Sequence, residues 1–370
     1  MQNMEWFREQ IDACDEQIVQ LINKRARYAQ EIGRIKRANG EPVYAPHREQ
    51  AVYEKVARLC EGPLTPQTMQ AIYREIMSGT IALEGASRIA YMGPAGSFSH
   101  MAALEKFGSS VEYLPQRDIR DVFLAVSRDH ADYGLVPMEN SVEGAVNVTN
   151  DMFMETEERI CSELFLPIHL NLLAKCPMAD VRIVMSHPQP LGQCRNWIAA
   201  NCTHIQVVET PSTTVAAQRA AEEPGVAAIA SEAAAQIYGL PVLERRIEDN
   251  VNNMTRFAVI AHESARPTGK DRTTVVFSLR HKAGSLYDAL IPFRTHGINL
   301  TRIESRPSKR RVWEYSFVVD FEGHVEDENV KRALAELVVD THDLRILGSY
   351  PRAERVRAIQ RPHADAARPE

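Results

Sequence analysis

The sequence predicts a multidomain protein with three architectures in order: an all-α segment, a two-lobed α/β block and a small α+β module. Three observations predict it. Helical apolar periodicity fills residues 1–84, short apolar strands alternate with capped helices over 88–265, and the order of elements changes after residue 272. A chain of 370 residues is also too long for one core. We expect these domain boundaries: 1–86, 87–266 and 272–351, followed by a disordered tail over 352–370.

The composition, 44% hydrophobic and 25% charged, is that of an ordinary soluble protein. Apolar runs are shorter than the roughly 18 residues of a membrane span, and the first ten residues are too charged for a signal peptide, so we expect a cytoplasmic protein without a membrane partner. The net charge of −6 argues against nucleic acid as a partner. The six cysteines form no CxxC pair, which argues against a metal site or a disulfide framework.

Three helices are expected in the first segment. Apolar side chains recur every three or four residues over about 7–37, and further helices are expected over 46–60 and 66–84, the last capped by Thr65. The first helix spans roughly 45 Å at about 1.5 Å per residue. It has too few partners within one chain, so we expect a homodimer, or a larger homo-oligomer, that interlocks these segments.

Basic side chains on the first helix indicate an anionic ligand. Arg25 interrupts the apolar stripe between Leu21 and Ala29, so its guanidinium must be paired or face a ligand. Lys36 lies about 20° round the helix from Arg25, on the same face. Arg8 lies about 100° from that face and suits the site of a partner chain better. A solvated basic helix is the alternative from these residues alone.

As a set, these positions resemble the all-helical chorismate mutase family over the whole segment. The resemblance implies Arg25, Lys36 and Glu84 as catalytic residues. It also implies substrate contacts from Arg48, Glu49, Thr80 and, across the subunit boundary, Arg8. The Claisen rearrangement of chorismate needs no nucleophile or base. It needs a folded dianion, with positive donors where the breaking ether oxygen gains charge.

Two positions depart from the best-known members of that family. Ala45 replaces a carboxylate that contacts a substrate hydroxyl, so this contact is either lost or made by Glu49. Glu84 stands where an amide is common, near the ether oxygen. An ionised carboxylate would repel that oxygen, so we expect Glu84 to act in its protonated form and mutase activity to fall as the pH rises.

Residues 88–265 contain the same order of strands twice. Strands are expected at 89–92, 111–114 and 133–136, and again at 183–185, 205–208 and 226–230. Corresponding strands are offset by about 94 residues, which predicts two equivalent lobes. Such lobes bind ligands in the cleft between them, outside the carboxyl ends of the strands.

Polar clusters follow those strands, and each alone is more typical of helix capping than of catalysis. They are 93–99 (GPAGSFS), 139–141 (ENS), 186–189 (SHPQ) with Gln193, and 211–214 (PSTT). The stretch 253–260 (NMTRFAVI) adds Thr255, whose hydroxyl is expected at the mouth of a strand. An ordinary strand-edge threonine is the alternative for Thr255 alone. Convergence of four clusters on one cleft favours a ligand site.

These motifs resemble prephenate dehydratases, a family with a two-lobed fold like that of periplasmic binding proteins. The resemblance implies a site that contains Thr255, Asn140, Ser141, Ser186, His187 and Gln193, with Glu139 and His169 also implicated. Prephenate loses carbon dioxide and its ring hydroxyl together because aromatisation drives the step. We expect Thr255 to donate to the departing hydroxyl, directly or through Glu139, without a cofactor. Arg256 is expected to pair with a carboxylate and Phe257 to lie in the core.

After a linker at 265–269, the expected order is strand 273–280, helix 285–295, strands 298–306 and 312–321, helix 326–339 and strand 344–350, which is the ferredoxin-like plan. A structural or dimerising appendage is the alternative. Residues 284–286 (GSL) and 304–307 (ESRP) resemble the two signatures of ACT domains. The resemblance implies L-phenylalanine as an inhibitor, bound between two modules near Gly284, Leu286, Asn299 and Leu300.

Together, the three segments predict a bifunctional enzyme of phenylalanine biosynthesis. Its small-molecule substrates would be chorismate, converted to prephenate, and prephenate, converted to phenylpyruvate, with feedback by phenylalanine. Two alternatives remain open: a monofunctional dehydratase whose helical segment only dimerises, and a noncatalytic two-lobed protein that binds an amino acid.

Overall fold

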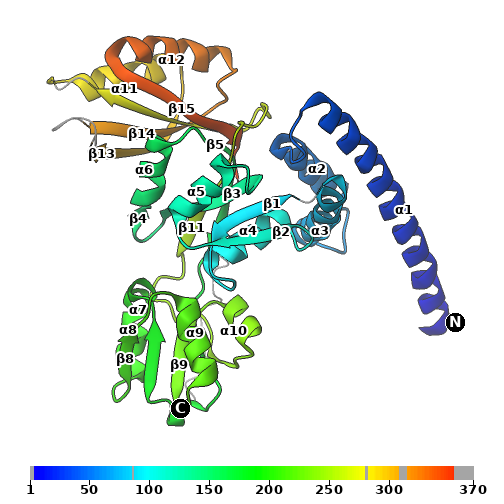
Figure 1. Cartoon of the computed structure of the whole chain (residues 1–370). Coiled ribbons are helices and arrows are strands. Elements are labelled where there is room, and N and C mark those ends of the chain that lie inside the picture. The colour runs from blue at the N-terminus through cyan, green and yellow to red at the C-terminus, as the bar shows by residue number, and fades with distance from the viewer. Residues whose placement is uncertain (1–3, 86, 280–281, 308–314, 354–370) are drawn as a thin grey trace, which may run out of the picture.

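The computed structural model describes residues 4–85, 87–279, 282–307 and 315–353 (Figure 1). The expected tail at 352–370 lies almost wholly outside these residues, as do parts of two expected strands near 280 and 312. Within the described residues, no helix is both long enough and apolar enough to cross a membrane.

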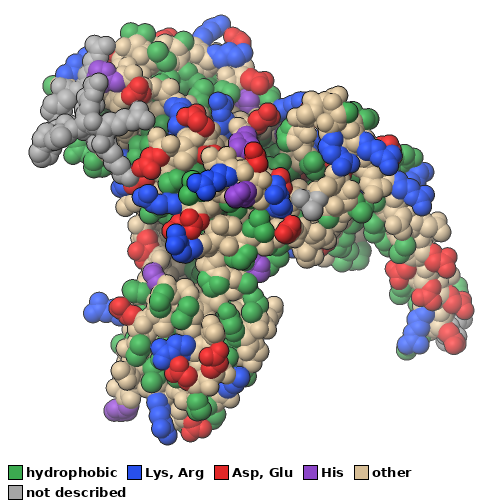
Figure 2. Space-filling model, viewed as in Figure 1, with side chains coloured by type: hydrophobic (Ala, Val, Ile, Leu, Met, Phe, Trp, Pro, Cys, Tyr) green, Lys and Arg blue, Asp and Glu red, His purple; other side chains and the backbone are tan. Residues whose placement is uncertain are grey.

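The N-terminal segment consists of three helices, as predicted: α1 (Met4–Asn39), α2 (Pro46–Leu59) and α3 (Pro66–Glu84). Thr65 caps α3 by accepting from the backbone N–H of Thr68. Helix α1 extends away from the rest of the molecule, and Gly33 is its one buried residue among those described (Figure 1). Figure 2 shows hydrophobic side chains in contact with solvent along this helix. The exposed hydrophobic side chains of α1 include Phe7, Ile11, Ile18 and Leu21, so one chain does not cover its apolar stripe.

The central block has two lobes, each built on its own sheet. The first sheet has the order β2-β1-β3-β11-β5 and the second the order β8-β7-β9-β6-β10. The strands of the first sheet are β1 (Arg88–Met92), β2 (Glu112–Gln116), β3 (Tyr133–Asn140), β5 (Arg159–Pro167) and β11 (Met254–Ala261), with β4 (Gly144–Ala145) paired to β3. Those of the second are β6 (Asn171–Ala174), β7 (Ile183–Ser186), β8 (Gln206–Glu209), β9 (Val226–Ala230) and β10 (Val242–Glu244).

The predicted repeat is confirmed by the strand pairing. β1 pairs in parallel with β2 and β3, and β7 pairs in parallel with β8 and β9. An antiparallel strand then follows in both lobes, β11 beside β3 and β6 beside β9. The second strand of each lobe starts one residue later than expected, at Glu112 and Gln206.

Helices cover both sheets, and several begin with the capping residues that the sequence offers. In the first lobe they are α4 (Phe98–Phe107), α5 (Ile119–Ser127) and α6 (Asn147–Glu155). In the second they are the 3₁₀ turn η1 (Met178–Asp180), α7 (Pro188–Gln193), α8 (Arg195–Asn201), α9 (Thr213–Glu222) and α10 (Glu232–Tyr238). Ser97, Ser212 and Ser231 each accept a bond from the backbone three residues on, at the starts of α4, α9 and α10.

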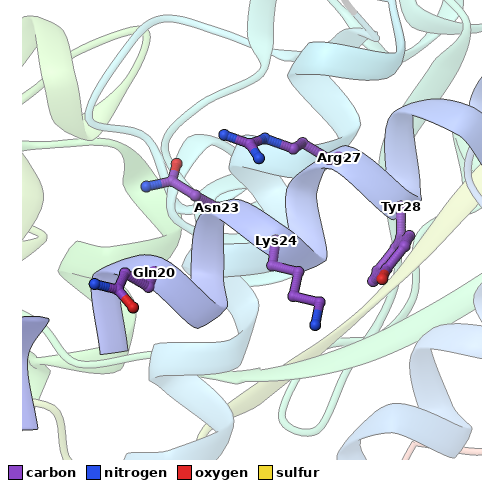
Figure 3. Close-up of a pocket in the computed structure, with 5 residues that line it drawn as sticks. All are labelled: Gln20, Asn23, Lys24, Arg27 and Tyr28. Carbon is purple, nitrogen blue, oxygen red and sulfur yellow. The ribbon is translucent and has the colours of Figure 1, made fainter. Parts of the chain in front are cut away.

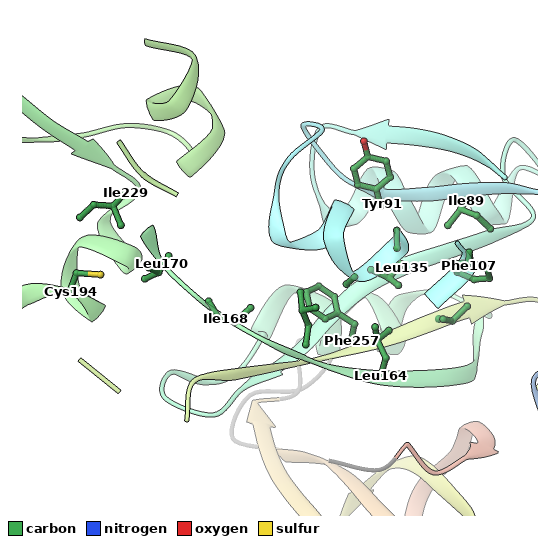
Figure 4. Close-up of a cluster of buried hydrophobic side chains, with 14 of the residues drawn as sticks. Ile89, Tyr91, Phe107, Leu135, Leu164, Ile168, Leu170, Cys194, Ile229 and Phe257 are labelled. Carbon is green, nitrogen blue, oxygen red and sulfur yellow. The ribbon is translucent and has the colours of Figure 1, made fainter. Parts of the chain in front are cut away.

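The lobes are joined by two chain crossings, one between β5 and β6 and one between β10 and β11 (Figure 1). A hydrophobic core follows the first crossing. Leu164 and Phe257 of the first lobe, Ile168 and Leu170 of the crossing, and Ile229 of the second lobe belong to one buried cluster (Figure 4). The crossing is therefore packed rather than a free linker.

The C-terminal module has a four-stranded antiparallel sheet in the order β13-β14-β12-β15. Its elements are β12 (Asp271–Leu279), α11 (Ser285–Thr295), β13 (Leu300–Pro307), β14 (Tyr315–Glu322), α12 (Glu328–Asp340) and β15 (Thr341–Pro351). This confirms the ferredoxin-like order, although β15 starts three residues earlier than expected. Val276, Val318 and Tyr350 pack against Ile160 and Ile260 of the first lobe in one buried cluster.

The module lies very close to the first lobe at Gly348 of β15. A Cβ atom added at this glycine would lie 2.1 Å from the backbone oxygen of Ile160 in β5. Gly348 also has φ +156°, which side chains rarely tolerate. The glycine is needed for the two backbones to meet, and the contact fixes the module on the first lobe.

Candidate active sites

A cavity of about 430 Å³ lies between α1, α2 and α3, and most of the residues predicted for the mutase site line it. Those of this chain are Arg25, Lys36, Arg48, Glu49, Thr80 and Glu84, with Ala45 beside them. Arg8 is exposed on the projecting end of α1 and does not line this cavity. The structure thus brings together the predicted set, apart from the residue expected to come from another chain.

Two cations of this cavity, Arg25 and Lys36, are held in place by hydrogen bonds. Arg25 Nη1 donates to Thr80 Oγ1 at 3.2 Å, and Thr80 in turn donates to the carbonyl of Ile76 at 2.7 Å. Lys36 Nζ donates to the carbonyl of Val43 at 2.7 Å. These bonds pre-orient the positive groups, which is what stabilisation of developing negative charge requires.

Glu84 is buried at the end of α3, against α1. A Cβ atom added at Gly33 would lie 2.7 Å from Cγ of Glu84, so the absence of a side chain at Gly33 makes room for the carboxyl group. Burial raises the pKa of Glu84, and the charges of Lys36, Arg37 and Arg25 oppose that rise. The raised pKa of Glu84 favours its protonated form, as the sequence predicts.

The carboxylate of Glu49 is fixed by three hydrogen bonds, which the sequence does not predict. Its Oε2 accepts from Tyr44 OH and from Lys106 Nζ, both at 2.7 Å, and its Oε1 accepts from Tyr53 OH at 3.4 Å. Lys106 belongs to α4 of the first lobe, 57 residues away in the chain. Sequence reasoning missed it because no local pattern pairs residues at that separation.

A second hollow lies along α1 and is lined by Gln20, Asn23, Lys24, Arg27 and Tyr28 (Figure 3). All five side chains come from the same helix. Since no second element among the described residues encloses it, we assign no site to this surface.

Three of the predicted dehydratase residues, Asn140, Gln193 and Thr255, meet where β3 ends and β11 begins, and Thr255 pairs with Asn140 in the strand register. Asn140 Nδ2 donates to Thr255 Oγ1 at 2.9 Å and to Asn253 Oδ1 at 2.8 Å. Asn253 Nδ2 donates to Gln193 Oε1 at 2.9 Å, and Gln193 Nε2 donates to Glu143 at 3.4 Å. This hydroxyl and amide cluster joins the two lobes. Asn253 was missed as a site residue, although it lies two positions before Thr255 in the same motif.

Thr255 and Asn140 are 8% and 6% exposed, so the cluster lies at the edge of the buried interior. Thr255 accepts the bond from Asn140 and does not use its own proton there. The hydroxyl is therefore oriented by a neutral amide with its proton left for another acceptor.

The loop and turn around the cluster are also fixed. Ser141 Oγ accepts from Met254 N at 3.0 Å and donates to the carbonyl of Asn252 at 3.2 Å. Ser231 Oγ of the second lobe donates to the carbonyl of Gly96 at 2.7 Å, which ties the GPAGSFS loop across the lobe boundary. Gly96 has φ +87°, and a Cβ there would lie 3.3 Å from Ala234 Cα.

Three predicted residues of the second lobe and the crossing lie outside the cluster. Ser186 is fully buried and donates to the carbonyl of Ile229 at 2.6 Å, and His187 caps α7. His169 Nδ1 lies 3.0 Å from Glu248 Oε1, and Glu248 also accepts from a backbone N–H. Ser186 and His187 therefore shape the second lobe in this structure, and Glu248 fixes the ring of His169.

Glu139 differs from its expected position. Successive side chains of a strand face opposite sides of the sheet, so Glu139 points away from the face that carries Asn140. Its carboxylate lies 3.6 Å from Arg302 Nε of β13 in the C-terminal module. The structure does not bring Glu139 to Thr255, and the expected relay between them is not formed.

Arg256 lies on that same far face and enters a buried ionic cluster, as predicted. It donates to Glu163 at 2.7 Å, to Tyr350 OH at 2.8 Å and to Asp320 of β14. Arg272 of β12 also pairs with Glu163, at 2.6 Å. Although burial opposes it, the charge of Arg256 lowers the pKa of Asp320. Phe257, the next residue, is 2% exposed in the core, as predicted.

The four predicted effector residues lie at the two ends of α11. Gly284, in the left-handed conformation with φ +85°, and Leu286 are at its start, and Asn299 and Leu300 follow its end. An 11-residue helix is about 16 Å long, so one module does not gather all four around one small ligand. A ligand that contacts both sets requires a second copy.

Comparison with known proteins gives matches over nearly all of the chain. The family model for chorismate mutase type II matches residues 7–85, that for prephenate dehydratase 89–265, and that for the ACT domain 273–339. A bifunctional chorismate mutase/prephenate dehydratase of Aquifex aeolicus is 46% identical over 358 residues, which covers 95% of this chain and 99% of the relative. Among the described residues, no group of three or more His, Cys, Asp or Glu is arranged to hold a metal ion.

Two solved structures match most of the chain. A prephenate dehydratase from Arthrobacter aurescens in complex with L-Phe has a TM-score of 0.67 and 34% identity, over 72% of this chain and 90% of that one. A protein described as a quorum-quenching acylase has a TM-score of 0.66 and 31% identity, over 71% of this chain and 97% of that one. With both catalytic domains, the sensor module and a full-length relative at this identity, the chain belongs to the family of bifunctional chorismate mutase/prephenate dehydratases.

Proposed function

We propose that the two reactions of this enzyme occur at the two separate sites described above. Chorismate rearranges in the cavity between α1, α2 and α3, and prephenate is dehydrated at the Thr255 cluster between the lobes. The observation that carries the proposal is the separation of the two groups of side chains: the cations line a helical cavity, and the amides and hydroxyl gather where β3 ends and β11 begins.

In the mutase cavity, Arg25, Lys36 and Arg48 bind the dianionic substrate in a folded conformation. Lys36 and protonated Glu84 donate towards the ether oxygen as the carbon–oxygen bond breaks and negative charge grows on it. The rearrangement moves electrons within one molecule, so no proton has to be transferred. The raised pKa of Glu84 supports this role, because only the protonated carboxyl group donates.

The alternative, a helical segment that only dimerises, is less well supported. A purely structural segment has no need to gather basic side chains around a cavity, since burial of unpaired cations is unfavourable. The hydrogen bonds of Arg25 to Thr80 and of Lys36 to Val43 hold the charges towards that cavity.

At the dehydratase site, Thr255 donates its proton to the ring hydroxyl of prephenate, which departs as water, and the hydroxyl of Thr255 regains a proton from solvent. Asn140 orients Thr255, and Gln193 and Asn253 connect the second lobe to the same ligand. Departure of the hydroxyl and loss of the carboxylate as carbon dioxide leave an aromatic ring, which provides the driving force. Because Glu139 faces Arg302, the direct role of Thr255 is favoured over a relay.

Separate sites are tested by supplying each substrate to two variants. From chorismate, Thr255→Ala should accumulate prephenate, whereas Lys36→Ala should form both products roughly 10²-fold more slowly. From prephenate, Lys36→Ala should form phenylpyruvate at the unaltered rate. Loss of both activities in either folded variant would contradict the proposal.

We further propose that L-phenylalanine inhibits the dehydratase by binding between two C-terminal modules. The complex of the Arthrobacter aurescens dehydratase with L-Phe supports this choice of effector. The positions of Gly284 and Asn299 at opposite ends of α11 support a site shared by two copies. Inhibition requires the effector to prefer a less active arrangement of the lobes. Asn299→Ala should raise the phenylalanine concentration needed for half-inhibition while uninhibited dehydratase activity stays unchanged.

A dimer is proposed for the same chain on independent grounds. The exposed apolar side chains of α1 need a cover, and Arg8 lies on this helix beyond reach of its own cavity. A second α1 packed along the stripe would bury these side chains and supply Arg8 to the facing site.

A further inference from the structure

The carboxylate of Glu49 lines the mutase cavity but is held by a residue of another domain. We infer that Lys106, in α4 of the dehydratase domain, is a positioning residue of the mutase site that fixes Glu49 and neutralises its charge. The inference rests on the proposed role of Glu49 as a substrate contact.

The hydrogen bonds of Glu49 fix both of its oxygens. Oε2 receives two donors, Tyr44 OH and Lys106 Nζ, each at 2.7 Å, which uses both of its lone pairs in the carboxylate plane. Oε1 receives one weaker donor, Tyr53 OH, at 3.4 Å. Burial, and next the charge of Glu49, raise the pKa of Tyr44 and of Tyr53, so both phenols are donors. One lone pair of Oε1 remains for a substrate hydroxyl.

The charge of Lys106 offsets the repulsion that the Glu49 carboxylate would exert on an anionic substrate. The substrate is a dianion, and an uncompensated negative charge beside it would oppose its binding. The side chains of Glu49 and Lys106 are only 12% and 14% exposed, so water screens their interaction weakly. Lys106 does not line the cavity, and it acts on the substrate only through Glu49.

The position of Lys106 is set by the packing between the two domains. Phe107, its neighbour on α4, lies with its ring centroid 5.2 Å from that of Tyr44, and Tyr44 lies 5.3 Å from Tyr133 of β3. Tyr44 thus contacts the dehydratase domain with its ring and Glu49 with its hydroxyl. Side chains of the dehydratase domain therefore hold Tyr44 and Glu49, two residues that line the mutase cavity.

The same interface offers a matched control. Glu105, next to Lys106 on α4, forms an ion pair with Arg74 of α3 at 2.8 Å. This pair also joins the two domains, but neither residue lines the mutase cavity. Glu105→Gln therefore removes an interdomain ion pair without touching Glu49.

The experiment measures the steady-state kinetics of both reactions on the full-length enzyme with chorismate and prephenate as probes. Lys106→Met should raise the KM for chorismate by roughly tenfold or more, since uncompensated charge opposes binding, with kcat changed by less than about threefold. Lys106→Arg should restore the KM, because it returns the charge. Prephenate turnover by Lys106→Met and both activities of Glu105→Gln should match the parent enzyme.

A double variant separates positioning from simple attachment of the domains. In the Glu49→Gln background there is no charge to neutralise, so adding Lys106→Met should leave the KM of Glu49→Gln unchanged. The double variant contains neither charge of this ion pair, so it also answers the question if Lys106→Met alone fails to fold. An equal rise in KM with and without Glu49, or the same rise in Glu105→Gln, would overturn the inference. If Glu49→Gln itself leaves the KM unaltered, the proposed substrate contact of Glu49 fails; if only Lys106→Met has no effect, the inference alone fails.

Discussion

The mutase cavity and the dehydratase cluster differ in the side chains they gather and in the elements that carry them. The cavity lies between helices and collects charged groups, among them Arg25, Lys36 and Glu84. The cluster lies at strand ends and collects a hydroxyl and neutral amides, with Thr255 and Asn140 at its centre.

This difference determines what each site requires from the rest of the molecule. In the helical cavity, Arg8 is proposed to come from a second chain, and Glu49 is held by Lys106 of another domain. The strand pairing of β3 with β11 places Thr255 and Asn140 side by side within one chain. The helical site is thus the more dependent on its surroundings, and the following predictions test that contrast.

The largest effect is expected at the cluster. Thr255→Ala should lower the dehydratase kcat by about 10³-fold, within the range of about 10²–10⁴ for loss of a positioned proton donor. Thr255→Ser keeps the hydroxyl and should retain most of the rate. Stopped assays of phenylpyruvate measure both. A dehydratase rate in Thr255→Ala within tenfold of the parent would show that another group donates the proton.

A smaller effect is expected at the cavity. Lys36→Ala should lower the mutase kcat by roughly 10²-fold, since loss of one donor to developing negative charge typically has an effect of that order. The control is Arg34→Ala, which removes an exposed cation paired with Glu31 on the same helix. It should leave the mutase kcat unchanged. Disappearance of chorismate measures the mutase rate. Equal losses in both variants would mean that net charge, not position, matters.

The dependence on a second chain is tested on α1. Ile18→Asp places a charge on the exposed apolar stripe and should weaken the dimer, lowering mutase activity by about tenfold at dilute protein while sparing the dehydratase. Gln17→Asp makes the same charge change about 100° round the helix and should have little effect. Size-exclusion chromatography with parallel assays measures both. An unchanged elution volume for Ile18→Asp would contradict the proposed interface.

The smallest effect is expected from protonation of Glu84. Its pKa is raised by burial, so the carboxyl group is protonated below that pKa and ionises as the pH rises through it. Mutase kcat should therefore fall a few-fold between about pH 5 and pH 8, whereas the Glu84→Gln variant should give a flatter profile. A parent profile that is flat over this range would remove the proposed role.

The sequence predicts the elements of both sites better than the contacts between them. Apolar periodicity places Arg25 and Lys36 on one helix face, and the structure puts both in one cavity. The register that pairs Thr255 with Asn140 joins positions 115 residues apart and cannot be read from either motif alone. The expected strand at 133–136 ends before Glu139 and Asn140. Had it been extended to include both, strand alternation would have placed their side chains on opposite faces of the sheet. Lys106 carries no local signal, because its partner belongs to another domain.

Strand β11 has one further consequence. Its consecutive residues Thr255 and Arg256 face opposite sides of the sheet, the first towards the dehydratase cluster and the second towards Asp320 of the C-terminal module. A single peptide unit joins the residue that carries the hydroxyl to the residue that carries the guanidinium. The shortest covalent path between the dehydratase cluster and a residue bonded to the C-terminal module is therefore one step along the backbone of β11.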